Sequence, residues 1–167
     1  TRLLHIGIQG YDVIPEERPR ANLVFLIDVS GSMSSPDKLP LAIQGLRMMI
    51  GEMDPDDTIA IVVYASASGV VLEPTPVSDR GRIEAALESL SAGGSTAGGE
   101  GLRLAYALAE RNFDEEAVNR VIMVTDGDFN VGITQDERLE DFVARKRESG
   151  VYLSVMGFGR GNYNDAL

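Results

Sequence analysis

Short apolar runs separated by amphipathic stretches dominate the hydrophobic pattern of this chain. Four runs are rich in β-branched residues and nearly continuous, a pattern typical of parallel strands covered on both faces. They lie at 23–27, 59–64, 121–124 and 151–155. Between them, apolar residues recur at helical spacing within 39–53, 83–90, 98–111 and 139–143. Strands that alternate with helices predict right-handed crossovers and an open, twisted sheet.

One segment breaks this alternation. Residues 70–72 follow the run at 59–64 after only a few small residues, too few for a helical crossover. A hairpin with an antiparallel edge strand is predicted, closed by Pro74 and Pro76. The predicted fold class is therefore α/β and Rossmann-like: a doubly wound, mostly parallel central sheet with one antiparallel edge strand and helices on both faces.

The first residues of the chain differ from the rest. Residues 3–13 have strand-like composition, but the proline-containing stretch at 15–19 reads as a linker. We expect residues 1–20 to form an N-terminal extension or edge strand plus linker, and residues 21–167 to form one domain. With 167 residues and 44% apolar residues, the chain can support one buried core.

Charge and cysteine content narrow the classes of partner. The formal net charge of −11 is spread along the sequence, which disfavours nucleic acid and anionic membranes as partners. No apolar stretch approaches the roughly 18 residues that span a bilayer, so direct membrane insertion is not expected. Because the chain has no cysteine, disulfides and thiolate metal sites are excluded.

Polar side chains follow two of the predicted strands. Asp28, Ser30 and Ser32 come directly after the first central strand and alternate, so their oxygens can converge on one side of a loop. Asp126 follows the strand at 121–124. Ligands of open α/β sheets bind beyond the carboxyl ends of the strands, so these groups are expected to share one rim. Oxygen donors at this density are a pattern typical of sites for hard cations.

A glycine-rich stretch adds a third element to this rim. Residues 93–99 precede the helical pattern at 98–111, and their glycines allow close approach of the backbone, while Thr96 or Ser95 supplies a further hydroxyl. Mg²⁺ takes six oxygens and usually keeps several waters. The predicted oxygen shell is incomplete, so at least one coordination position would stay open.

These residues together resemble the von Willebrand factor type A domain and its metal-ion-dependent adhesion site. The resemblance covers nearly all of the chain from about Asn22 onward, with each motif in the order that the family has. It implies a bound Mg²⁺, with Mn²⁺ or Ca²⁺ as alternatives, and the ligands Asp28, Ser30, Ser32, Thr96 and Asp126. In the family, an acidic residue of a partner protein completes the coordination shell.

The resemblance also carries expectations about the whole molecule. It implies a protein-binding module for adhesion or assembly rather than an enzyme, without fixing its oligomeric state. The sequence around the motif is most similar to that of bacterial envelope or secreted members of the family, which implies an extracytoplasmic location. A full domain of the family usually adds a helix and a strand beyond the run at 151–155, so we expect the domain to be truncated at its C-terminal end.

Other interpretations of the same residues are weaker. Each serine alone could cap a helix, and Asp28 could form a turn in a scaffold without metal. Asp28 could also serve a metal-assisted hydrolase or phosphotransferase, but the usual second carboxylate two residues later is Ser30. No Lys-Ser or Lys-Thr follows the glycines, which excludes a P-loop.

Four further groups of residues stand out in the sequence. Asp126, Asp128, Asn130 and Glu137 follow a calcium-loop spacing, but Val131 stands where the turn glycine belongs. The single histidine, His5, lies far from the motif. Met48, Met49 and Met53 are expected in the core. Asp37, Glu100 and Asp128 would form an acidic lip, so a partner would need basic residues around its acid.

Overall fold

Five strands form one mixed sheet in the computed structural model, which describes residues 18–93, 98–127 and 139–159. The strand order is β3-β2-β1-β4-β5. All neighbouring pairs are parallel except β2 and β3, which form the antiparallel hairpin at one edge. The strands are β1 (Ala21–Asp28), β2 (Thr58–Tyr64), β3 (Ser68–Pro76), β4 (Val118–Thr125) and β5 (Tyr152–Gly157). The predicted fold class is confirmed.

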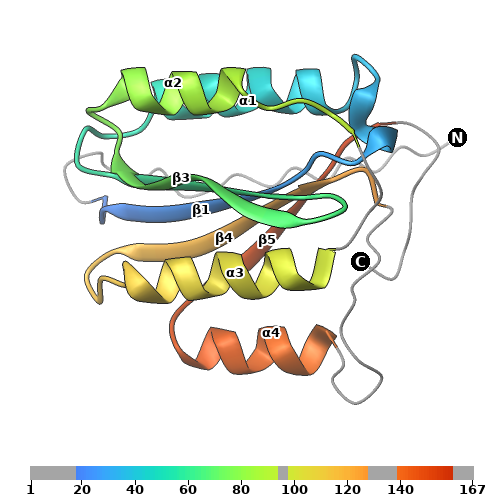
Figure 1. Cartoon of the computed structure of the whole chain (residues 1–167). Coiled ribbons are helices and arrows are strands. Elements are labelled where there is room, and N and C mark those ends of the chain that lie inside the picture. The colour runs from blue at the N-terminus through green and yellow to red at the C-terminus, as the bar shows by residue number, and fades with distance from the viewer. Residues whose placement is uncertain (1–17, 94–97, 128–138, 160–167) are drawn as a thin grey trace, which may run out of the picture.

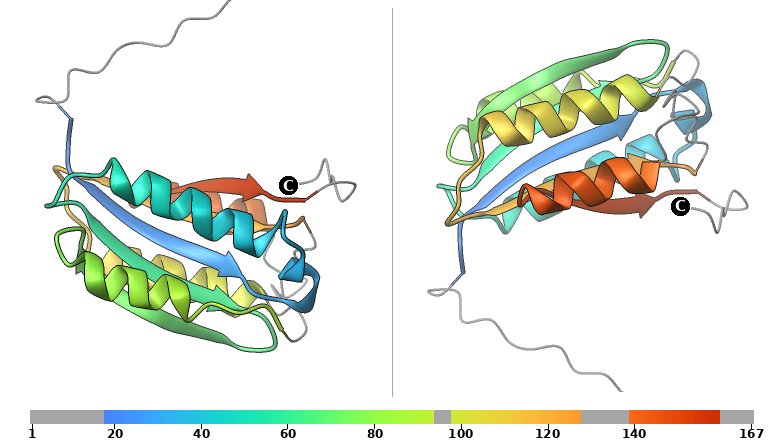
Figure 2. Two further views of the ribbon diagram at one scale, coloured as in Figure 1. Left: turned by 90° about the horizontal axis from the view of Figure 1, so that it is seen from above. Right: turned by 90° about the horizontal axis from the view of Figure 1, so that it is seen from below.

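Helices cover both faces of this sheet. They are the 3-10 helix η2 (Gly31–Ser34) and the α-helices α1 (Leu39–Gly51), α2 (Arg80–Glu88), α3 (Gly98–Arg111) and α4 (Leu139–Glu148). Helices α1 and α2 lie on one face and α3 and α4 on the other (Figures 1 and 2). None of the helices among the described residues is long and apolar enough to cross a membrane.

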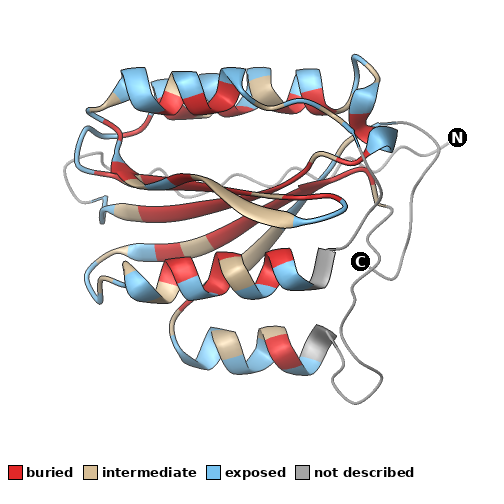
Figure 3. Ribbon diagram, viewed as in Figure 1, coloured by how far each residue is buried: buried red, intermediate tan, exposed pale blue. Residues whose placement is uncertain are grey.

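Strand β1 shows why the apolar runs are continuous. Phe25 and Ile27 pack into the core beneath α1 and α2. Val24 and Leu26 point the opposite way, into a second core against α3. All four side chains have no solvent exposure, and burial is concentrated along the central strands (Figure 3). A strand with both faces buried cannot alternate polar with apolar residues.

The edge strand β3 is longer than the sequence predicts. The prolines were expected to close the hairpin, yet β3 continues through Pro74 to Pro76. Ile59 pairs with Thr75 and Ile61 with Leu72, so the register is irregular at Pro74. Proline has no backbone N–H to donate. It is tolerated there because edge strands and bulges contain positions whose N–H is not needed for a hydrogen bond to a neighbouring strand.

The three methionines around α1 do not share one environment. Met53 is buried and Met49 packs partly against the core, as expected. Met48 is 75% exposed, so its expected place in the core is wrong. The buried positions of α1 are Leu39, Ala42, Leu46 and Ile50, and Met48 lies outside that three-and-four spacing.

A buried carboxylate fastens the beginning of β1 to the turn before β2. The Asp57 side chain has no solvent exposure and pairs with Arg18. It accepts hydrogen bonds from the backbone N–H groups of Ala21, at 2.7 Å, and Asp54, at 2.9 Å. Both carboxylate oxygens are therefore used, and the chain entering the sheet is held at a fixed position.

Truncating this carboxylate should destabilise the fold. We expect Asp57→Ala to lower the free energy of unfolding by about 3 kcal/mol, because two backbone N–H groups lose their acceptor and Arg18 loses its buried partner, although it keeps its pair with Asp54. Urea unfolding followed by circular dichroism would measure the change. The neighbouring exposed Asp56 is the matched control, since Asp56→Ala should stay within about 0.5 kcal/mol of wild type. Equal effects of the two variants would contradict this account of Asp57.

A tyrosine hydroxyl lies buried beneath α4. Tyr106 is fully buried on α3, and its ring meets that of Phe142 edge-on with centroids 5.4 Å apart. Within the described part of the chain its hydroxyl has no hydrogen-bond partner. Burial, followed by the charge of Glu110, raises the pKa of Tyr106 to about 12. The ring contributes packing, whereas the hydroxyl carries a desolvation cost.

Removing that hydroxyl should stabilise the domain. We expect Tyr106→Phe to raise the free energy of unfolding by about 1 kcal/mol at neutral pH. Because the folded-state pKa is raised, the stability linked to the neutral phenol is present below about pH 10 and is lost as pH rises towards 12. The variant should therefore lose less stability than wild type over that range, as measured by urea unfolding at several pH values. A variant less stable than wild type at neutral pH would show that the hydroxyl has a partner.

Candidate metal centre

Two parallel strands bring two carboxylates to the same edge of the sheet. Asp28 ends β1 and Asp126 directly follows β4. In the parallel pairing of these strands Ile27 lies opposite Val124, so the residues after them emerge side by side. Asp28 has no solvent exposure and Asp126 only 3%. Two acidic groups are thus buried at one rim, where a charge without a counter-charge is costly.

Asp28 is held by donors on both of its oxygens. The backbone N–H of Ser30 donates to Oδ1 at 2.8 Å. The hydroxyls of Tyr64, at 3.3 Å, and Thr125, at 3.4 Å, approach Oδ2. Burial raises the pKa of Asp28, with a further contribution from the charge of Asp126, while the bonds from Ser30 and Tyr64 act in the opposite direction. The orientation of Asp28 is fixed, and its negative charge would be stabilised by a nearby cation.

A close helix packing supports Tyr64. A Cβ atom added to Gly101 would lie only 2.9 Å from the Cβ of Tyr64, so glycine lets α3 lie against the end of β2. The Tyr64 hydroxyl is in turn directed at Asp28. The position of α3 and the orientation of the first carboxylate are therefore linked through one aromatic side chain.

The two serines provide neutral oxygens beside the carboxylates. The hydroxyl oxygens of Ser30 and Ser32 lie 3.0 Å apart. Ser30 is 2% exposed and occupies the N-cap position of η2, but its hydroxyl makes no capping bond. The interpretation of Ser30 as a helix cap therefore has no support. Ser32 is exposed, so this cluster of oxygens faces solvent on one side.

Lys38 belongs to this cluster, although the sequence analysis did not select it. Its Nζ lies 2.8 Å from Asp126 Oδ2 and 3.0 Å from the backbone oxygen of Ser32. The signal that could have identified it is its isolation: it is the only basic residue between Arg20 and Arg47, and it directly precedes a predicted helix. An ammonium group thus neutralises one of the two buried carboxylates.

The donor set fits a hard divalent cation. Carboxylate and hydroxyl oxygens are the ligands that Mg²⁺ and Ca²⁺ prefer, and the ammonium of Lys38 shows that the rim accommodates positive charge. Among the described residues, no three His, Cys, Asp or Glu side chains gather as a metal site. An ion at this rim would therefore depend on the serine hydroxyls and on water to complete its shell.

Part of the predicted site lies outside the described residues. Thr96 is one such residue, so its assignment as a ligand stays a prediction. The others are Asp128, Asn130 and Glu137 of the calcium-loop spacing, and His5. The start of the glycine-rich stretch is described: the N–H of Gly93 donates to the carbonyl of Val29 at 2.7 Å. This bond holds the beginning of that stretch against the loop that carries Ser30.

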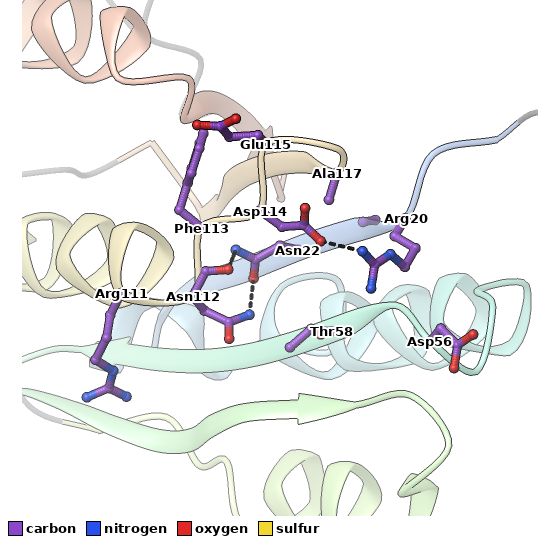
Figure 4. A pocket seen from close by; sticks show the side chains of 11 residues that line it. Arg20, Asn22, Asp56, Thr58, Arg111, Asn112, Phe113, Asp114, Glu115 and Ala117 are labelled. Carbon is purple, nitrogen blue, oxygen red and sulfur yellow. Dashed lines mark hydrogen bonds and ion pairs between the residues drawn. The ribbon is translucent and has the colours of Figure 1, made fainter.

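A polar hollow of about 490 Å³ lies at the other end of β1, where that strand begins (Figure 4). Its lining side chains bond to one another: Arg20 pairs with Asp114 at 2.7 Å. Asn112 donates to the side-chain oxygen of Asn22 at 3.0 Å. These groups are satisfied within the protein and hold the C-terminal end of α3 to β1. The carboxyl edge of the sheet, and not this hollow, is therefore the candidate functional site.

Comparison with known proteins supports the fold and the family. Residues 23–129 match the family model described as the von Willebrand factor type A domain. The chain is 47% identical over 165 residues to the uncharacterized protein YfbK of Escherichia coli, covering 99% of this chain and 29% of that protein. The chain thus spans less than a third of this relative.

Comparison with solved structures supports the same fold. BatB from Bacteroides thetaiotaomicron superposes with a TM-score of 0.65 at 28% identity, covering 82% of this chain and 66% of that one. Manganese-loaded TRAP protein of Plasmodium vivax has a TM-score of 0.67 at 22% identity, over 86% and 59% of the two chains. A mussel byssus matrix protein with a zinc-occupied adhesion motif gives 0.67 at 17%, over 86% and 39%. The last two likenesses show the fold alone.

The match to the family model covers most of the sheet, and the two strand ends that carry Asp28 and Asp126 lie within it. This chain belongs to the von Willebrand factor type A domain family.

Proposed function

We propose that this domain is a divalent-metal-dependent protein-binding module. In this proposal Asp28, Ser30, Ser32, Thr96 and Asp126 hold a Mg²⁺ ion, and a partner protein supplies an Asp or Glu to the open coordination position. The single observation that carries the proposal is that two buried carboxylates and two serine hydroxyls lie on one rim of the sheet. The two hydroxyl oxygens are 3.0 Å apart. Mn²⁺ is the first alternative ion, as in the loaded TRAP protein, followed by Ca²⁺.

The balance of charged and neutral donors suits binding of a carboxylate. A bound divalent ion would supply an electrophilic centre that keeps positive charge, because serine and threonine hydroxyls do not neutralise it. Asp28 would hold the ion directly or through water, and it would also orient the loop through its bond from Ser30. Ser32 is exposed on the side of the oxygen cluster that faces solvent, so it would lie nearest to an incoming partner protein.

A catalytic use of Asp28 has less support. A nucleophilic carboxylate needs an accessible lone pair, but Asp28 is fully buried and accepts hydrogen bonds on both oxygens. Its neighbour two positions on is Ser30, which is a poor general acid. Binding therefore remains the preferred function, and a metal-assisted hydrolase or phosphotransferase is the second candidate.

The surroundings of the rim point to the chemistry of the partner. Asp37 and Glu100 are exposed, and Glu100 lies in the first turn of α3. An acidic surface repels an acidic partner unless basic residues flank its carboxylate. We propose a partner with that mixed charge. By likeness to an aerotolerance-related membrane protein of Bacteroides fragilis, which is 27% identical, we also propose a bacterial envelope setting on the extracytoplasmic side.

Metal dependence is tested by thermal unfolding in chelator and in millimolar Mg²⁺, Mn²⁺ or Ca²⁺. We expect the ion to stabilise the wild type, by about 2.7 kcal/mol when its concentration is about 100 times the Kd. The double variant Ser30→Ala, Ser32→Ala should lose most of this gain. Ser34→Ala, which removes an exposed hydroxyl from the same 3-10 helix, should keep it. Absence of any metal response in wild type would favour a scaffold without metal.

The acidic partner is tested by selecting random displayed peptides on the protein. Peptides retained in Mg²⁺ and released by chelator should be enriched in Asp and Glu, with Lys or Arg nearby, because the open position takes a carboxylate. The same selection performed in chelator throughout should give no such enrichment. Metal-dependent peptides without acidic residues would contradict the proposed mode of binding.

A further inference from the structure

We propose that Lys38 is a built-in counter-cation that competes with the divalent ion for Asp126 and so sets the metal affinity of the site. This inference rests on the proposed function and concerns a residue outside the predicted ligand set. In the metal-free domain the ammonium compensates the buried carboxylate. Binding of a divalent ion would then have to displace the ammonium or act against its charge.

The pair between Lys38 and Asp126 is a desolvated one. The Lys38 side chain is 14% exposed and that of Asp126 is not exposed at all, with 2.8 Å between Nζ and Oδ2. Exposed ion pairs contribute little, but removing a cation that pairs with a carboxylate buried to this degree is strongly destabilising. The domain without metal therefore depends on this pair.

The remainder of the Lys38 side chain is also confined. Its Nζ donates a second bond to the Ser32 backbone oxygen at 3.0 Å. A Cβ atom added to Gly159 would lie 2.8 Å from Lys38 Cε and 3.3 Å from Cγ, so the backbone after β5 runs along the stem. The backbone of Lys38 is fixed too, since its carbonyl accepts from the N–H of Ala42 at 2.8 Å. The ammonium is thus directed at the rim by contacts on several sides.

A charge count gives the direction of the effect. With all three groups ionised, Asp28, Asp126 and Lys38 together carry one net negative charge. Without the ammonium the rim would carry two, and the attraction for a divalent ion would increase accordingly. At separations of a few ångströms and intermediate dielectric, one unit charge changes a binding constant by a factor of about ten or more. Lys38 should therefore weaken metal binding.

The test is calorimetric titration of Mn²⁺ or Mg²⁺ alone into chelator-treated protein. We expect Lys38→Met to bind the ion at least about tenfold more tightly than wild type. Lys38→Arg keeps the charge and should show no comparable gain. Lys146→Met is the matched control, because Lys146 also forms an ion pair, with Glu110 at 2.8 Å, but on α4, away from the rim. Its metal affinity should equal that of wild type.

Thermal unfolding adds a readout that does not depend on calorimetry. Lys38→Met should melt below wild type in chelator, because the buried Asp126 loses the ammonium beside it, and should gain more than wild type when metal is added. Lys38→Gln, which is neutral but polar, serves if the methionine variant does not fold.

Two failures can be told apart. If wild type binds metal but neither neutral variant binds it more tightly, Lys38 only holds the loop, and this inference alone is overturned. If no variant and no wild-type sample binds metal at millimolar concentration, the proposed function fails and this inference fails with it.

Discussion

The site depends on two carboxylates that are buried at the same edge of a parallel sheet. Asp28 and Asp126 are almost completely removed from solvent, and an ionised carboxylate in that setting needs donors or a cation close by. The domain supplies both: hydroxyl and N–H donors at Asp28, and the ammonium of Lys38 at Asp126. The contacts at the rim are consequences of this one electrostatic requirement.

The sheet order explains why the requirement arises at this place. Strand β1 lies between β2 and β4, and both of these neighbours are parallel to it. Because Ile27 lies opposite Val124, Asp28 and Asp126 emerge side by side at the carboxyl edge of the sheet. Tyr64, at the end of β2, directs its hydroxyl at Asp28, and α3 packs closely against Tyr64 at Gly101.

Much of this could be predicted from local sequence. The apolar runs at 23–27, 59–64 and 121–124 predicted buried strands correctly. The run at 151–155 was expected to be covered on both faces, but β5 is largely exposed, with Val155 43% exposed, so that expectation is wrong. Asp28, Ser30, Ser32 and Asp126 were selected because they lie in stretches that follow predicted strands, and their role as ligands stays a prediction. Contacts between distant residues were missed. The pair of Lys38 with Asp126 spans 88 positions and depends on where α1 begins.

The other differences have equally physical causes. Pro74 remains within β3 because the register of the strand pairing shifts there. A proline in the sequence does not by itself show whether such a shift is present. Met48 is exposed because helical spacing in α1 buries Leu46 and Ile50 instead. The three methionines were assigned to the core as a group, without comparing each one with that spacing.

The distribution of these groups along the chain has a consequence for protein engineering. The hydrogen bond from Gly93 to Val29 and the pair between Lys38 and Asp126 tie together segments that are far apart in sequence. A short peptide carrying only the Asp28 to Ser32 loop would lack the second carboxylate, its counter-ion and the buried surroundings that orient both. Transplanting this site to another scaffold would require a parallel sheet with two adjacent strand ends, and not a loop alone.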